Sequence, residues 1–217
     1  MQSSASRLRI TEIFYSLQGE SRTSGYATVF IRLTGCPLRC EYCDTAYAFK
    51  GGEWYSFEDI LAEVKKYNTK YITVTGGEPL AQNRCIDLLQ LLCDEGYEVS
   101  LETSGALDIS KVDPRVSRVM DLKTPASKEE SKNLYSNIEL LTAHDQLKIV
   151  ICNRKDYEWA VGKINEYDLL SRCDVIFSTS HQQLAPQELA DWILEDQLAV
   201  RFQMQLHKYL WNDEPGR

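Results

Sequence analysis

Three cysteines that lie close together in the sequence carry the clearest chemical signal in this chain. Cys36, Cys40 and Cys43 follow a β-rich apolar run over residues 27–33, with the spacing C-x3-C-x2-C. Three thiolates in one loop can hold a metal ion or an iron–sulfur cluster, and a cubane normally takes four protein sulfurs, one for each iron. Three ligands would leave one iron with an open position, as a catalytic metal site does. An iron that binds a small chelate there and passes it one electron would generate a radical.

This spacing resembles the cluster-binding loop of the radical S-adenosylmethionine (SAM) superfamily. The alternatives are a structural zinc loop with a fourth ligand elsewhere, or cysteines that only pack in the interior. A second cluster is less favoured, because no two of the other cysteines share a closely spaced loop. We expect those four to be reduced thiols beside apolar residues: Cys85, Cys93, Cys152 and Cys173.

Length and charge restrict the class of protein. The chain has 217 residues, which fits one domain spanning 1–217. Its 24 basic and 32 acidic residues give a net charge of -8, which argues against non-specific binding to nucleic acid or to a membrane surface. No apolar run approaches the roughly 20 residues that cross a bilayer. Residues 1–9 lack the apolar core of a signal peptide, so we expect a cytoplasmic protein.

Strand and helix patterns alternate along the chain, which predicts an α/β fold with a parallel sheet and right-handed crossovers. About six such units are too few for a closed eight-stranded barrel. We therefore expect a partial, open TIM-like barrel of about six parallel strands with helices outside and the functional groups at the carboxyl ends of the strands. The expected strands are 10–17, 27–33, 71–75, 97–101, 116–121, 146–151, 174–177 and 199–205, and the expected helices are 56–67, 83–95, 134–143, 156–167 and 186–196.

Polar groups follow several of these strands. The Gly-Gly-Glu-Pro turn at 76–79 lets a ligand approach the backbone closely, although an ordinary strand-to-helix turn is an equal alternative. Arg32 stands in an apolar strand and needs a partner, since an unpaired buried charge is costly. That partner would be a carboxylate of a substrate or of the protein, with Glu20 the obvious candidate. His207, which follows the last expected strand, is more often structural than catalytic in such a place.

Longer motifs extend the resemblance to one family. The chain is similar to the 7-carboxy-7-deazaguanine synthases, radical SAM enzymes of the 7-deazapurine (queuosine) pathway, from about residue 10 to residue 210. The segments that carry the resemblance are EIFYSLQGE (12–20), VFIRLTGC (29–36), CEYCDT (40–45), GGEP (76–79), ETSG (102–105), LKIV (147–150) and QLHKY (205–209).

The resemblance implies a lyase that converts 6-carboxy-5,6,7,8-tetrahydropterin to 7-carboxy-7-deazaguanine with loss of ammonia. A 5′-deoxyadenosyl radical would take hydrogen from C6 of the pterin, ring contraction would follow, and SAM would be recycled. The implied cofactors are a [4Fe–4S] cluster, SAM and Mg²⁺. The implied partners are the pterin, an external electron donor of flavodoxin or ferredoxin type, and a second copy of the chain in a homodimer.

The resemblance also assigns roles to residues of this sequence. The cluster would be bound by Cys36, Cys40 and Cys43, and Mg²⁺ by Thr45. The SAM contacts would come from Tyr42, Cys43, Asp44, Gly76, Gly77, Glu78, Gly105, Asp121, Leu122, Lys123, Ser178, Thr179 and Ser180. The substrate contacts would come from Leu17, Gln18, Gly19, Glu20, Arg32, Thr103 and His207.

The sequence departs from the family pattern at three places. Asp121-Leu122-Lys123 stands where many relatives have Ser-Pro-Lys, and residues 178–180 stand where many have a Gln-Pro pair. Some relatives end in a proline whose carboxylate reaches the substrate, whereas Pro215 is followed here by two further residues. That role is therefore not assigned to this chain.

Two other functions remain open at this point. Another radical SAM enzyme, such as a glycyl-radical activase, would share the cysteine loop and the GGEP turn but would bind a protein partner. That alternative gives the LQGE segment and Arg32 no role. A non-catalytic zinc or iron–sulfur binding module would need a fourth nearby ligand and would not bind SAM.

Overall fold

The computed structural model describes residues 7–181, 183–212, 214 and 216. Two of the expectations above lie wholly or partly outside the described residues: the lack of a signal-peptide core, which concerns residues 1–9, and the chain end at Pro215. Within the described ranges, no helix is long and apolar enough to cross a membrane.

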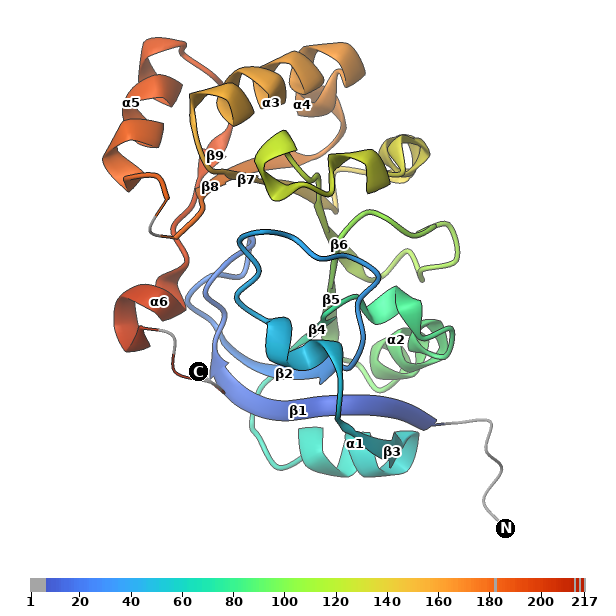
Figure 1. The fold of residues 1–217 in the computed structure, drawn as a ribbon. Helices are drawn as coiled ribbons and strands as arrows, with labels where there is room; N and C mark the ends of the chain where they lie inside the picture. The colour runs from blue at the N-terminus through green and yellow to red at the C-terminus, as the bar shows by residue number, and fades with distance from the viewer. Residues whose placement is uncertain (1–6, 182, 213, 215, 217) are drawn as a thin grey trace.

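One sheet organises the described part of the chain (Figure 1). Its strand order is β3-β1-β2-β4-β5-β6-β7-β8-β9, with every pairing from β2 to β9 parallel and β1 antiparallel to both of its neighbours. This confirms the predicted α/β fold with an open parallel sheet. The strands are β1 (Arg7–Leu17), β2 (Ala27–Leu33), β3 (Glu53–Ser56), β4 (Tyr71–Gly76), β5 (Glu98–Thr103), β6 (Ser117–Asp121), β7 (Gln146–Ile151), β8 (Asp174–Thr179) and β9 (Arg201–Phe202).

All helices but the last lie on the outer side of the curved sheet, and the loop that follows β2 lies across its opening (Figure 1). Helix α1 begins where the sequence predicts, because Ser56 and Asp59 form a capping box in which each side chain accepts a hydrogen bond from the backbone of the other. The helices are α1 (Phe57–Val64), α2 (Cys85–Asp94), α3 (Arg154–Tyr167), α4 (Leu169–Arg172), α5 (Pro186–Glu195) and α6 (Leu206–Trp211).

The core lies between the sheet and these helices. The central residues of β4 are buried on both of its faces: Ile72 and Val74 pack in the apolar core, and the threonines on the other face are hydrogen-bonded to Gln18 and Glu102. Helix α2 adds Leu88, Leu89 and Leu92, each fully buried. Complete burial of one such side chain contributes about 1.5–3 kcal/mol. The core therefore fixes the carboxyl ends of the strands relative to one another.

The structure differs from the prediction in the type of one helix and in the length of one strand. Residues 134–143 contain a 3-10 helix (Tyr135–Leu140) rather than an α-helix. The Asn137 side chain donates to the backbone carbonyls of Gly105 and Leu107, and such bonds compete with helical ones. The last strand is only two residues long, because Gln203 leaves the sheet edge to exchange hydrogen bonds with the backbone of Ser21.

An ion pair is buried at the end of the sheet opposite the cysteine loop. Asp145 is fully buried and accepts hydrogen bonds from the guanidinium group of Arg118 and from Thr142. Although burial raises its pKa, these bonds hold the pKa of Asp145 below the usual value. Removal of one partner from a buried pair leaves an uncompensated charge, whereas an exposed pair contributes little.

We predict that Asp145→Asn lowers the free energy of unfolding by about 3–5 kcal/mol. The matched control is Asp174→Asn, which breaks the exposed pair with Arg22 and should cost about 0–1 kcal/mol. Urea denaturation of the cluster-free protein measures both. Because the folded pKa of Asp145 is lowered, its contribution is complete above the unfolded pKa and is lost as the pH falls through the folded pKa. Equal losses in the two variants would contradict the prediction.

Candidate active site

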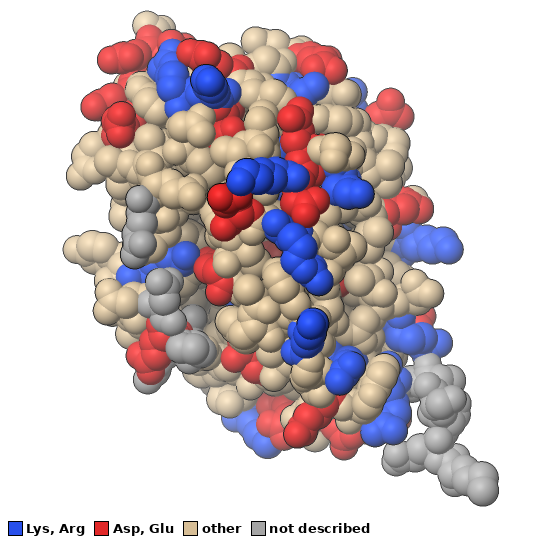
Figure 2. Space-filling model, viewed as in Figure 1, with Lys and Arg blue, Asp and Glu red and all other residues tan. Residues whose placement is uncertain are grey.

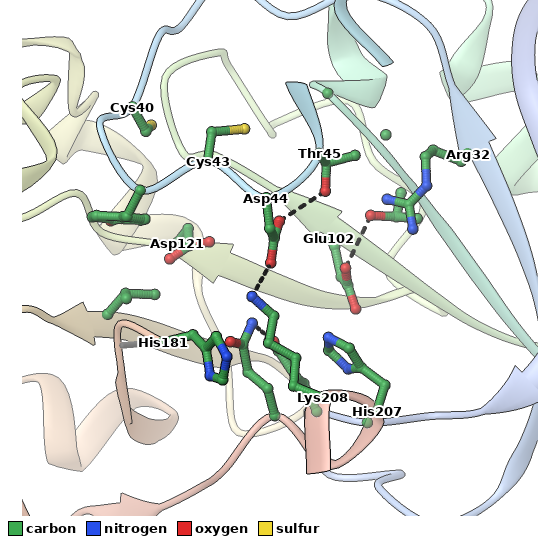
Figure 3. A pocket seen from close by; sticks show the side chains of 18 of the residues that line it. Arg32, Cys40, Cys43, Asp44, Thr45, Glu102, Asp121, His181, His207 and Lys208 are labelled. Carbon is green, nitrogen blue, oxygen red and sulfur yellow. Dashed lines mark hydrogen bonds and ion pairs between the residues drawn. The ribbon is translucent and has the colours of Figure 1, made fainter. Parts of the chain in front are cut away.

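The carboxyl ends of the parallel strands surround a cavity of about 400 Å³ (Figure 3). Its wall includes the cysteine loop, the ends of β1, β2 and β4–β8, and residues at the start of α6. On the face shown in Figure 2, acidic and basic side chains lie next to one another. The wall itself is rich in charged side chains, so the geometry of their pairing determines what the cavity can bind.

The three cysteines of the loop all line this cavity and are half-buried. Arg39 holds the loop in shape, since its guanidinium group donates to the carbonyl of Cys36 at 2.8 Å and lies over the ring of Phe49 at 4.2 Å. Among the residues the structure describes, no three acidic, histidine or cysteine side chains are grouped as donors to one metal ion. A cubane does not require such grouping, because each thiolate binds a different iron.

The glycines of the GGEP turn are needed for packing against the cysteine loop. A Cβ atom on Gly77 would lie 2.4 Å from the carbonyl oxygen of Gly35 and 2.7 Å from Cβ of Cys36. A Cβ atom on Gly76 would lie 2.5 Å from the carbonyl oxygen of Leu33. All three distances are too short for any side chain, so this turn sets the position of the loop that carries the first cysteine.

Glu78 of the same turn does not face the cavity. Its carboxylate is fully buried and accepts hydrogen bonds from the hydroxyl groups of Thr103 and Ser104 and from the backbone N–H groups of Ser104 and Leu80. The side chain thus connects the turn after β4 to the turn after β5. The contact between Glu78 and SAM that the resemblance implies stays a prediction, and the cavity wall does not include this residue.

The cavity includes some of the residues that the resemblance assigns to SAM and leaves out others. Leu122 is buried in the core, because side chains alternate between the two sides of an extended segment and its neighbours Asp121 and Lys123 face the cavity. The assigned residues that line the cavity are Tyr42, Cys43, Asp44, Gly76, Gly77, Asp121, Lys123 and Ser180, and those that do not are Glu78, Gly105, Leu122, Ser178 and Thr179.

Lys148 on β7 is the centre of a buried charge network. Its ammonium group lies 2.5 Å from Glu20 and 3.6 Å from Asp121, which in turn lies 3.2 Å from Lys123. Burial acts to raise the pKa of Glu20 and Asp121, but the neighbouring ammonium groups hold the pKa of each carboxyl below its usual value. The same carboxylates raise the pKa of Lys148, against the effect of burial. All four groups are therefore charged near neutral pH.

Two buried polar atoms in this region have no hydrogen-bond partner within the described part of the chain. They are Oδ1 of Asp121 and the hydroxyl group of Tyr42. Both belong to residues that line the cavity next to Lys123. Buried polar atoms are usually hydrogen-bonded, so these two fit a polar ligand that supplies a donor and an acceptor.

Arg32 has a different partner from the one suggested by the sequence. Its Nε atom donates to Glu12 at 2.7 Å, and Glu12 also accepts a hydrogen bond from Tyr47. Glu12 and Arg32 are directly opposite on the antiparallel strands β1 and β2, whereas Glu20 is held by Lys148. The predicted ion pair between Arg32 and Glu20 is therefore wrong. The Arg32 side chain remains part of the cavity wall.

The start of α6 closes the cavity on the side between β1 and β9. His207 packs so tightly on Gly19 that a Cβ atom there would lie 2.3 Å from its Nδ1 atom. Lys208 pairs with Asp44 at 2.9 Å, and the Thr45 hydroxyl donates to the other oxygen of Asp44 (Figure 3). Burial raises the pKa of Asp44, but the Lys208 ammonium group and the Thr45 hydroxyl lower it to about 2.

The sequence analysis assigned no role to four charged residues of the cavity wall: Glu102, Lys148, Lys208 and Glu214. Lys148 stands within an otherwise apolar strand, as Arg32 does, so the argument that identified Arg32 applies to it equally. Glu102 directly follows the expected strand 97–101, at the start of the ETSG segment. Lys208 belongs to the QLHKY segment after the last expected strand, so the sequence places it near the ends of the strands, although it did not predict α6. Its proximity to Asp44 depends on the tertiary structure alone.

Three comparisons with known proteins agree with one another, two on the family of this chain and one on its fold. The family model described as the radical SAM superfamily matches residues 30–123. The chain is 42% identical to the 7-carboxy-7-deazaguanine synthase of Chlorobaculum tepidum, over 95% of this chain and 96% of that protein. It is also 42% identical to the enzyme of that name from Koribacter versatilis, over 95% and 98%. The crystal structure of QueE from Escherichia coli shares the fold, with a TM-score of 0.77, 22% identity and coverage of 93% and 95%.

We predict that Gly77→Ala impairs cluster assembly, because the added methyl group would displace Cys36 and the carbonyl of Gly35. Iron and sulfide content after anaerobic reconstitution should fall well below the wild-type values. The matched control is Gly162→Ala in α3, where a Cβ atom meets nothing within 4 Å. A fully loaded Gly77→Ala protein would show that the turn does not position the cysteine loop.

Proposed function

The chain belongs to the 7-carboxy-7-deazaguanine synthase family of radical SAM enzymes, and from this premise we propose which of its residues carry the reaction. The activity is that of a carbon–nitrogen lyase in 7-deazapurine biosynthesis. It converts 6-carboxy-5,6,7,8-tetrahydropterin to 7-carboxy-7-deazaguanine with loss of ammonia. The observation that supports this function best is the identity of 42% across 95% of the chain, together with the three cysteines and the charged groups around one cavity.

The family implies a [4Fe–4S] cluster and SAM, and the cavity has groups that fit both. The thiols of Cys36, Cys40 and Cys43 would hold the cluster. When bound, the reduced cluster and SAM supply the one-electron chemistry that removes hydrogen from C6 of the substrate. The unpartnered oxygen of Asp121 and the Tyr42 hydroxyl would bind the polar groups of SAM. Lys123, beside Asp121, would balance a carboxylate.

The substrate would occupy the part of the cavity between β1, β5 and α6. Gln18, Arg32 and His207 line that part, and Gly19 lets His207 approach closely. The charges of Glu20 and Lys148 are fixed before the substrate arrives, because each is the partner of the other. Such preorganised groups orient a ligand without the cost of rearrangement. The start of α6 would keep bulk water from a reactive radical.

The Mg²⁺ role implied for Thr45 is part of this proposal. Thr45 lines the cavity, and its hydroxyl is within hydrogen-bond distance of the carboxylate of Asp44. A hydroxyl group, a carboxylate and substrate oxygens are the hard oxygen ligands that Mg²⁺ takes. The ion would orient the substrate carboxylate and stabilise negative charge there.

The remaining assignments are supported by the family resemblance. We propose a homodimer, reduction by a flavodoxin- or ferredoxin-type donor, and a cytoplasmic location. The continuous nine-stranded sheet supports a single domain over 1–217. A glycyl-radical activase or a metal-binding module is less well supported, because neither gives a role to the charged groups around Arg32 and Lys148.

We predict that anaerobically reconstituted protein forms 7-carboxy-7-deazaguanine from 6-carboxytetrahydropterin with SAM, dithionite and Mg²⁺, as followed by mass spectrometry. Cys40→Ala should form none, because the cluster loses one of its three ligands. The matched control is Cys93→Ala in α2, outside the cavity wall, which should keep the activity. If SAM is cleaved to 5′-deoxyadenosine but no 7-carboxy-7-deazaguanine forms, the assignment to the radical SAM superfamily stands and the proposed substrate is wrong.

We also predict that Thr45→Val, which replaces the hydroxyl with a methyl group, lowers kcat/KM at saturating Mg²⁺ by at least about tenfold. The variant should also lose stimulation by Mg²⁺, whereas Thr45→Ser should retain it. Titration of each protein with Mg²⁺ after chelation measures the effect. A wild-type rate that does not change on chelation would contradict the Mg²⁺ assignment.

A further inference from the structure

We propose that Glu102 recognises the pyrimidine half of the substrate by accepting hydrogen bonds from its 2-amino group and from the adjacent ring N–H. This inference rests on the proposed function and names a residue that determines substrate specificity. It starts from the position of Glu102 near the carboxyl end of β5, where its side chain lines the cavity among Arg32, Thr45 and His207 (Figure 3).

The carboxylate of Glu102 is oriented by one hydroxyl group, but its capacity to accept hydrogen bonds is not used up. Its Oε2 atom accepts a hydrogen bond from Thr75 at 2.9 Å. Its Oε1 atom has only a 3.5 Å contact with the Gln18 amide, which makes a shorter bond, of 3.0 Å, to Thr73. No ion pair involves Glu102 within the described part of the chain. The carboxylate therefore has acceptor capacity that faces the cavity.

The other acidic groups around the substrate side of the cavity are already engaged. Glu12 binds Arg32 and Tyr47, and Glu20 binds Lys148 and Gln205. Asp44 is paired with a lysine and a hydroxyl group. The free oxygen of Asp121 lies beside Lys123 and Tyr42, at the end of the cavity near the cysteine loop. Glu102 thus remains as the acceptor for a donor edge of the substrate.

The chemistry of the substrate fits this acceptor. A 2-aminopyrimidin-4-one presents a ring N–H and an amino N–H side by side in one plane, as a guanidinium group does. A carboxylate accepts two such parallel hydrogen bonds, and this arrangement combines strength with geometric specificity. Burial raises the pKa of Glu102 above its usual value; the charge of Lys148 opposes this rise, and the charge of Glu20 adds to it. Two donors from the substrate would favour the ionised carboxylate, which the free site stabilises poorly.

The test compares the substrate with an analogue that lacks only the 2-amino group, which is remote from the reacting carbon. For the wild-type holoenzyme, kcat/KM should be at least about 100-fold lower for the analogue, because a site built around a buried acceptor rejects a ligand without the donor. Glu102→Gln should lower kcat/KM for the substrate by about 100-fold. The ratio of kcat/KM between substrate and analogue should then fall below about tenfold. The N–H group of the glutamine amide would face an N–H group of the substrate, and neither can accept a hydrogen bond.

The matched control is Glu98→Gln, the same change at an exposed position on the same strand, which should leave both values unchanged. Equal use of substrate and analogue by the wild-type enzyme would overturn the inference, as would full discrimination by Glu102→Gln. The wild-type comparison does not depend on folding of the variant. Absence of turnover by the wild type would contradict the proposed function instead. Binding of 7-carboxy-7-deazaguanine and its 2-deamino analogue to the holoenzyme would then still decide the role of Glu102.

Discussion

The pairing of charges at the carboxyl ends of the parallel strands is the constraint on which the site depends. A charge placed inside an apolar sheet is costly unless an opposite charge and hydrogen bonds compensate it. Lys148 meets this requirement by contact with Glu20 from the end of β1 and Asp121 from the end of β6. Two distant parts of the chain are thereby held against one cation, and the cavity beside them keeps its shape.

The cysteine loop depends on a second constraint, which is close backbone contact. Glycine at 76 and 77 brings the turn after β4 against the residues that precede and include Cys36, at distances that no side chain allows. Glu78 then ties that turn to the turn after β5 through Thr103 and Ser104. The GGEP turn therefore positions the cysteine loop, and the carboxylate of Glu78 forms its hydrogen bonds with other residues of the protein.

The two ends of the sheet are therefore specialised differently. At the amino ends, Arg118 and Asp145 form a fully satisfied pair that contributes to stability. At the carboxyl ends, Asp121, Tyr42 and Glu102 keep acceptor or donor capacity that the described residues do not use. A folded protein tolerates such groups where a ligand completes them, which is consistent with a cavity built for polar cofactors and a polar substrate.

The α/β fold class and the family could be predicted from the sequence alone. Cysteine spacing, the alternation of strands and helices, and capping residues such as Ser56 are local properties that the chain carries wherever it folds. The partners of the charged side chains became known from the folded chain: Arg32 pairs with Glu12, Lys148 with Glu20, and Lys208 with Asp44. The tertiary structure also turned Glu78 and Leu122 away from the cavity and brought Glu102 into it. Such pairings follow from strand register and from the path of the chain after β9. Neither can be predicted from the spacing of nearby residues in the sequence.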